Sequence, residues 1–242
     1  MKVCIIQPSY IPWKGFFHQI AKSDIFVFLD TVQYDKRGWR NRNQIKTLNG
    51  PIWLTIPVHA HGTHNGLLIQ NVHVQDMQWA ERHLQSLRQH YKKAPCFEQE
   101  FPWICELLLS VQNESSISKL TGTITQAIAE RLGLGDIQFF YASDLDIDTQ
   151  NPSQRLLSIV KAVGADSYLS GPAAKDYLEV EMLEHVGIQV EWMQYDYPEY
   201  SQLYPPFTHQ VSILDLILMV GSGQVGDYVW AKPLTACGVC PE

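Results

Sequence analysis

Residues 3–30 read VCIIQPSYIPWKGFFHQIAKSDIFVFLD, and this stretch decides the fold. Residues 3–6 and 25–29 are short apolar runs, and between them apolar side chains recur at helical spacing over residues 14–22. Strands that are apolar without alternation are typical of a parallel sheet covered on both faces. The stretch therefore predicts strand, helix and parallel strand, the start of a doubly wound α/β fold.

The same alternation of strands and helices returns in the second half of the chain, which predicts a Rossmann-like parallel sheet. A last helix, apolar on nearly all sides, is predicted over residues 212–220 and should be buried. The other predicted elements are strands at residues 137–141, 167–169 and 188–192 and helices at residues 152–163 and 172–186.

The middle of the chain has a different pattern and predicts an insertion. Two β-rich runs, residues 52–58 and 66–74, flank a polar loop and predict a hairpin. Three amphipathic helices should follow. We predict a single α/β domain over residues 1–232 with this insertion at about residues 48–135, and a flexible C-terminal tail over residues 233–242. The three helices are predicted at residues 76–91, 97–110 and 115–132.

Composition limits the classes of partner. The 242 residues are 45% hydrophobic and 18% charged, which suits one large globular domain or two small ones. The formal net charge of −7 opposes non-specific attachment to nucleic-acid phosphates, so no bulk nucleic acid is expected and any basic site must be local. No apolar run is long enough to cross a bilayer, which predicts no membrane span and a cytoplasmic location. The oligomeric state stays open.

Two groups of residues resemble metal sites, but neither is complete. Cys237 and Cys240 form a CxxC pair, yet no second pair or nearby histidine supplies the remaining ligands of a zinc ion. His59, His61 and His64 lie close in sequence without a carboxylate or thiolate beside them. We predict no structural metal, with at most opportunistic zinc binding at the histidines.

In open parallel sheets, ligands bind beyond the carboxyl ends of the strands, so the loops there are the candidates for a site. The first loop contains two prolines and leads into a helix whose free amides attract an anion. The side-chain amide of Gln7 can form hydrogen bonds with a ligand. His18 lies one helical turn from Lys14 and could contact the same anion. The alternative is that Tyr10 and Trp13 cap the core and that His18 is structural.

The second loop follows Asp30 and is basic, with five of the chain's eighteen Lys and Arg residues. In an acidic protein this concentration, mixed with aromatic and amide side chains, suits a phosphate, a carboxylate or a nucleotide. The alternative is a solvated basic surface loop. The candidate ligand-binding residues of this loop are Gln33, Tyr34, Lys36, Trp39, Arg40, Asn41, Arg42, Asn43 and Lys46.

The third loop begins with Ser170 and Gly171 and passes from a predicted strand into a predicted helix. Its backbone amides would face an anion, although ordinary helix capping explains the same residues. Asp196, Tyr197 and His209 follow the next strand and can complete the pocket.

At these loops the chain resembles the WbqC-like family, which is associated with bacterial surface-polysaccharide gene clusters. The likeness runs almost end to end and includes His83, the 91–97 stretch, the 170–172 loop and the 212–216 helix. Its most specific parts are Gln7-Pro-x-Tyr10-x-Pro12-Trp13-x-Gly15-Phe-Phe, Phe28-Leu-Asp30-x-Val-Gln33-Tyr34-x-Lys36 and Trp39-x-Asn41-Arg42-Asn43-x-Ile-Lys46.

A weaker likeness is to nucleotidyltransferases of the pantothenate synthetase type. They too have a Pro-rich loop after the first strand and a Gln-Tyr or Gln-Phe segment after the second, here Gln33-Tyr34. This chain has only His18 where that class has a two-histidine motif.

Two functions fit these observations. The first is a transferase or ligase, of nucleotidyl or acyl/aminoacyl type, that uses a phosphate-bearing activated donor in cell-envelope glycan biosynthesis. Asp30 and His18 would be its catalytic residues, Trp13, Tyr34 or Trp39 would stack on a ring, and Mg²⁺ would accompany a nucleotide. The second is a non-catalytic module that binds a nucleotide or a nucleotide sugar, which the lack of a clear pair of nucleophile and base supports.

Overall fold

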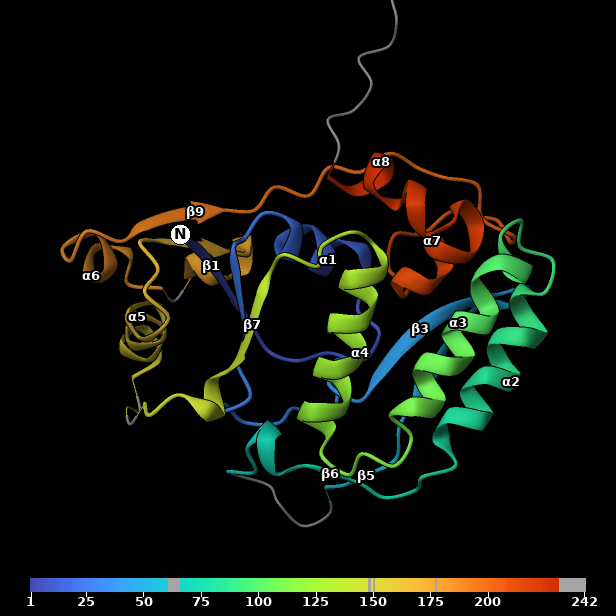
Figure 1. Ribbon diagram of the computed structural model, residues 1–242, viewed down its shortest axis with the longest axis horizontal. Helices are drawn as coiled ribbons and strands as arrows, with labels where there is room; N and C mark the ends of the chain where they lie inside the picture. Colours follow the sequence, from blue (N-terminus) through green and yellow to red (C-terminus); the bar gives the residue numbers. More distant parts are fainter. Residues whose placement is uncertain (61–65, 148, 150, 177, 231–242) are drawn as a thin grey trace, which may run out of the picture.

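The computed structural model describes residues 1–60, 66–147, 149, 151–176 and 178–230 and contains a five-stranded, wholly parallel sheet (Figure 1). The spatial order of the strands is β7-β2-β1-β8-β9, so the chain runs outward from β1 on one side and returns to β8 on its other side. The predicted doubly wound, Rossmann-like sheet is confirmed. Its strands are β1 (Lys2–Ile6), β2 (Ile25–Phe28), β7 (Gln138–Tyr141), β8 (Ser167–Ser170) and β9 (Gln189–Trp192).

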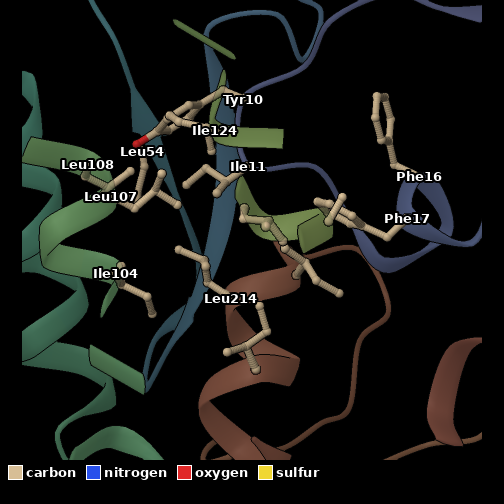
Figure 2. Packing of buried hydrophobic residues seen from close by; sticks show 14 of the residues in the cluster. Tyr10, Ile11, Phe16, Phe17, Leu54, Ile104, Leu107, Leu108, Ile124 and Leu214 are labelled. Atoms are coloured by element: carbon tan, nitrogen blue, oxygen red, sulfur yellow. The ribbon is translucent and has the colours of Figure 1, made fainter. Parts of the chain in front are cut away.

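Helices cover both faces of the sheet because its strands are apolar on both sides. Val3 and Ile5 of β1 pack against α5 (Pro152–Ala162) and α6 (Val180–Glu184), whereas Cys4 belongs to the larger core on the opposite face. That larger core also contains Tyr10 and Ile11 of the first loop, which lie among side chains of the insertion and of the last long helix (Figure 2). Its helices are α1 (Lys14–Ala21), α2 (Trp79–Tyr91), α3 (Phe97–Ser110), α4 (Ile117–Arg131), α7 (Ile213–Val220) and α8 (Val225–Val229).

The insertion between β2 and β7 contains a hairpin that differs from the predicted one. β4 (Gly50–Thr55) pairs with β3 (Arg42–Thr47), not with residues 66–74, and thus the end of the predicted basic loop is a strand. Ile45 of β3 and Leu54 of β4 lie in the core, and the charged Arg42 and Lys46 of β3 hid its strand pattern in the sequence. A separate two-residue pair, β5 (Val58–His59) with β6 (His73–Val74), follows, and a 3₁₀ turn occupies Ile69–Asn71.

The predicted helix over residues 172–186 is wrong, because the structure has a 3₁₀ turn at Pro172–Asp176 and then the short α6. Ala174 and Leu183 are both buried, yet nine residues are two and a half turns of an α-helix and would place them on opposite sides. The chain must therefore break between them. The remaining 3₁₀ turns are Ala142–Asp144 and Ser222–Gln224. Within the described residues, no helix is both long and apolar enough to span a bilayer.

Candidate functional site

A pocket of about 700 Å³ lies at the carboxyl end of β1, next to the point where the strand order reverses. This is the position at which doubly wound sheets bind their ligands. The lining comes from β1, the first loop and α1, the basic loop, and the segment after β9: Ile6, Ser9, Pro12, Trp13, Phe16, Gln19, Trp39, Arg40, Asn43, Tyr195, Asp196, Tyr197, His209 and Gln210.

The first loop is held in a strained conformation by the basic loop. Ile11 has a φ of 36°, which is unfavourable for a β-branched side chain. The Nδ2 atom of Asn43 donates to the carbonyl oxygens of Ile11 (2.8 Å) and Tyr10 (3.1 Å), and the amide of Tyr10 donates to the carbonyl of Trp39 (3.0 Å). With Ile11 fully buried, these bonds fix the position of Trp13 at the start of α1.

One wall of the pocket consists of three aromatic rings. The ring of Trp13 lies 5.2 Å from that of Tyr195 and 6.0 Å from that of Tyr197, in edge-to-face contacts. Gly15 leaves room for the Trp13 indole, because a Cβ atom there would lie 2.3 Å from the indole ring. Flat rings that are partly exposed in this way can contact a planar or apolar part of a ligand.

Arg40 provides the positive charge of the pocket. The Nε atom of Arg40 is buried and has no hydrogen-bond partner among the described residues. The Arg40 guanidinium also forms no ion pair with any described residue. Burial lowers the pKa of Arg40 to about 10, although the nearby Asp35 and Tyr34 oppose this effect, so the side chain remains charged at neutral pH. Burying a charged donor without an acceptor is costly, so Arg40 is the residue of the pocket lining that could contact an anion.

His209 lies in the same pocket with its Nδ1 atom buried and without a partner among the described residues. Burial, followed by the positive charge of Lys14, lowers the pKa of His209, while Glu199 opposes the shift. A neutral imidazole with a free ring nitrogen can accept a proton from a bound molecule.

Lys14 and His18 lie behind the aromatic wall. The Nζ atom of Lys14 lies 4.8 Å from the ring centroid of Tyr197, with Tyr200 and Phe207 also within 6 Å. Burial lowers the pKa of Lys14 to about 8, against the attraction of Asp215. His18 Nδ1 lies 3.0 Å from the Tyr197 hydroxyl, and burial and Lys22 lower the pKa of His18 to about 4. Neither residue lines the pocket.

Asp30, the other predicted catalytic residue, is engaged elsewhere. Its carboxylate accepts hydrogen bonds from the Ser118 hydroxyl (2.8 Å) and from the amide (3.0 Å) and hydroxyl (2.9 Å) of Ser143. These partners belong to α4 and to the turn after β7, on the β7 side of the sheet. Asp30 thus ties the end of β2 to its neighbours, and it is not part of the pocket lining.

Several residues of the predicted site support the loops from inside. Tyr10 is fully buried, and its hydroxyl lies 2.7 Å from His83 Nδ1. The Tyr34 hydroxyl donates to Asn41 (2.9 Å), whose Nδ2 donates to the carbonyl of Ile56 (2.8 Å). Each of these side chains is buried and hydrogen-bonded within the protein, so none of them presents its polar group to a ligand in this structure.

Two basic residues of the predicted set also bind within the protein. The Nζ atom of Lys46 donates to Gln202 and to the carbonyl of Pro206. The guanidinium of Arg42 donates to the carbonyls of Arg37 and Gly38 and covers the ring of Trp53 at 4.3 Å. Through these contacts, Lys46 and Arg42 hold neighbouring segments of the chain together, so both side chains have structural roles.

The remaining predicted residues lie around the pocket or outside it. Gln33 and Lys36 are exposed, and Gln7 is half-buried at the end of β1. Ser170 is buried, with its hydroxyl 3.3 Å from that of Tyr168. A Cβ atom on Gly171 would lie 3.5 Å from the hydroxyl of Tyr195, which places Gly171 beside the aromatic wall.

The pocket includes residues that the sequence analysis did not select. Gln19, Tyr195 and Gln210 belong to the lining, and His209 was only a supplementary candidate. Gln19 lies one turn after Phe16 on α1, a spacing that indicates a shared face. The segment after β9 has no periodicity by which to place its residues.

The two metal-like groups fall partly or wholly outside the described residues. His59 is exposed at the end of β5, whereas His61, His64, Cys237 and Cys240 are not described. Within the described part of the chain, no three His, Cys, Asp or Glu side chains form a group that could hold a metal ion.

Together, the sheet order and the pocket define a Rossmann-like α/β protein with an aromatic pocket, in whose lining the buried Nε atom of Arg40 has no partner among the described residues. The chain belongs to the WbqC-like protein family, whose model matches residues 7–226. It is 35% identical over 230 residues to the uncharacterized protein Rv1507c of Mycobacterium tuberculosis, covering 94% of this chain and 97% of that relative. No solved structure gives a significant match.

Proposed function

We propose that the pocket binds a phosphate-bearing activated donor and that the protein is a transferase or ligase. The observation that carries this proposal is the buried Nε atom of Arg40 without a partner among the described residues. A guanidinium presents parallel N–H donors that match the oxygens of a phosphate or carboxylate. The aromatic wall beside it would contact the ring of a nucleotide-like donor.

His209 is the base that we propose for group transfer. A hydroxyl or amine of the acceptor attacks the electrophilic centre of the donor, and the bond from that centre to the phosphate-bearing leaving group breaks. The proton of the acceptor passes to the imidazole of His209, and Arg40 stabilises the negative charge on the leaving group. His209 replaces His18 and Asp30 in the proposed catalytic set because it lines the pocket and they do not.

The biological setting is part of the same proposal. The resemblance to the WbqC-like family implies a connection with surface polysaccharides, so we place the reaction in cell-envelope glycan assembly. Mg²⁺ would enter the pocket with a nucleotide donor, bound to its phosphates, because the described residues contain no group of three His, Cys, Asp or Glu side chains that would hold the ion on the protein.

Calorimetry with inorganic pyrophosphate tests the anion site. Arg40→Gln should weaken binding about tenfold or more, because a charge-assisted pair contributes about 1.5–3 kcal/mol. Lys36→Gln is the matched control, since Lys36 is exposed in the same basic loop and lies outside the pocket lining. Equal affinities of Arg40→Gln and the wild type would contradict the proposal.

Turnover separates the transferase from a non-catalytic binding module. The purified protein is incubated with nucleoside triphosphates, nucleotide sugars, acyl-CoA and charged tRNA, and products are detected by mass spectrometry. We expect donor consumption that falls at least about a hundredfold in His209→Asn while pyrophosphate affinity stays unchanged. Binding without any product across this panel would favour the module.

A further inference from the structure

The mouth of the pocket differs chemically from its interior. Three lining residues are exposed, namely Trp39, Asp196 and Gln210, whereas all others in the lining are buried or half-buried. We call these three residues the rim. The rim offers an indole, a carboxylate and an amide, whereas Arg40 and His209 of the same lining are half-buried.

We propose that the rim is a subsite for a sugar ring. A pyranose has C–H groups on its faces, which can rest on an indole, and hydroxyl groups around its edge. A carboxylate can accept hydrogen bonds from two neighbouring hydroxyls, and an amide can both donate and accept. The exposed carboxylate of Asp196 disfavours a second phosphate at the same place, which favours a neutral polyhydroxylated ring over another anion.

The indole of Trp39 packs against the indole of Trp53, which limits its movement. Its ring centroid lies 5.0 Å from that of Trp53, and the guanidinium of Arg42 lies 4.3 Å from the ring of Trp53. Arg42 also donates to the carbonyls of Arg37 and Gly38, which orders the backbone just before Trp39. A residue that is 41% exposed is thus positioned before any ligand arrives, which lowers the entropic cost of binding.

The sugar ring would be the acceptor, or the sugar of the acceptor, and this role rests on the proposed function. The position of the subsite does not depend on it. A ring at the rim would direct a hydroxyl or amine inward, toward the His209 imidazole and the group held by Arg40.

The test uses saturation-transfer NMR of the full chain with the methyl pyranosides of glucose, galactose, mannose and N-acetylglucosamine at millimolar concentration. At least one should bind, and Trp39→Ala and Asp196→Asn should each weaken its binding about fivefold or more. Ile52→Ala is the matched control, because Ile52 is 36% exposed on the β3–β4 hairpin, which also carries Trp53, and does not line the pocket.

The outcomes separate this inference from the proposed function. Arg40→Gln should leave pyranoside binding unchanged while it weakens pyrophosphate binding. If pyranosides bind at Trp39 but pyrophosphate does not bind the wild type, the donor proposal fails and the subsite stands. If no pyranoside binds, if Trp39→Ala binds like the wild type, or if uridine and adenosine bind at Trp39 in their place, the inference is overturned.

Discussion

Asn43 stabilises a loop conformation that the loop's own residues disfavour. Its side chain is 3% exposed and donates to two carbonyl oxygens beside the strained Ile11. Asn43→Asp has nearly the same shape but would place a carboxylate against those carbonyls. We expect a loss on the order of 3 kcal/mol in the free energy of unfolding, measured by urea titration.

The control for this prediction is Asn49→Asp, an exposed position in the turn between β3 and β4. It should change the free energy of unfolding by less than about 0.5 kcal/mol. An equal effect of the two substitutions would show that Asn43 does not clamp the loop.

His83 should make the protein sensitive to acid. Its Nε2 atom lies 3.2 Å from the carbonyl of Thr55 and therefore donates, so Nδ1 accepts from the Tyr10 hydroxyl and the ring is neutral. Burial lowers the pKa of His83 to about 4; the hydrogen bond to Thr55 opposes this shift, and the positive charge of Arg82 adds to it. The unfolded chain, with a histidine pKa near 6.5, binds the proton more readily in the range between these values.

Stability from His83 is therefore fully present above about pH 6.5 and is lost as the pH falls toward 4. Between pH 7 and 4.5 the wild type should lose about 2 kcal/mol through this residue. His83→Gln cannot titrate, so its unfolding free energy should fall by that much less over the same range. Parallel pH profiles of the two proteins would refute the assignment.

At the scale of elements, Glu100 joins parts of the chain that are distant in sequence. It is fully buried in α3, where Oε2 accepts from Arg131 of α4 (3.1 Å) and Oε1 accepts from the amide and hydroxyl of Ser222 (both 2.9 Å). Glu100→Ala should cost about 3 kcal/mol of unfolding free energy, because it leaves several donors unpaired.

The matched control for Glu100 is the exposed pair between Lys119 and Asp144, at 3.3 Å. Asp144→Ala should cost less than about 1 kcal/mol, because water screens such surface pairs. Comparable losses in Glu100→Ala and Asp144→Ala, measured by chemical unfolding, would mean that burial does not strengthen the Glu100 contacts.

How well each element could be predicted depends on whether its pattern is local. The β1, α1 and β2 segments were predicted almost to the residue, because their apolar runs depend only on the sheet being covered on both faces. β3 was missed because Arg42, Gln44 and Lys46 dominate its composition. Its other residues, Asn43, Ile45 and Thr47, are buried, and so is Lys46 despite its charge. Its partner strand is set by tertiary packing, which the local sequence does not encode.

At the scale of the whole molecule, the topology explains why the pocket lies where it does. The pocket lies at the end of β1, where the general rule for parallel sheets places ligands. The rule does not indicate that the segment after β9 supplies Tyr195, Tyr197 and His209 to the lining. That segment crosses from the edge strand β9 back to α1, as its contacts with Lys14 and His18 show. Because it has no helix or strand periodicity, only the folded chain reveals its contribution.

The central claim, that Arg40 is an anion site, has a direct spectroscopic test. In the ¹H–¹⁵N spectrum of the arginine side chains, the Nε resonance of Arg40 is assigned by its absence in Arg40→Lys and followed during titration with inorganic pyrophosphate. We expect this resonance to shift in a saturable manner and to exchange more slowly with solvent, since Nε–H gains an acceptor that the described residues do not provide. A resonance that stays unchanged while other signals report pyrophosphate binding would contradict the account.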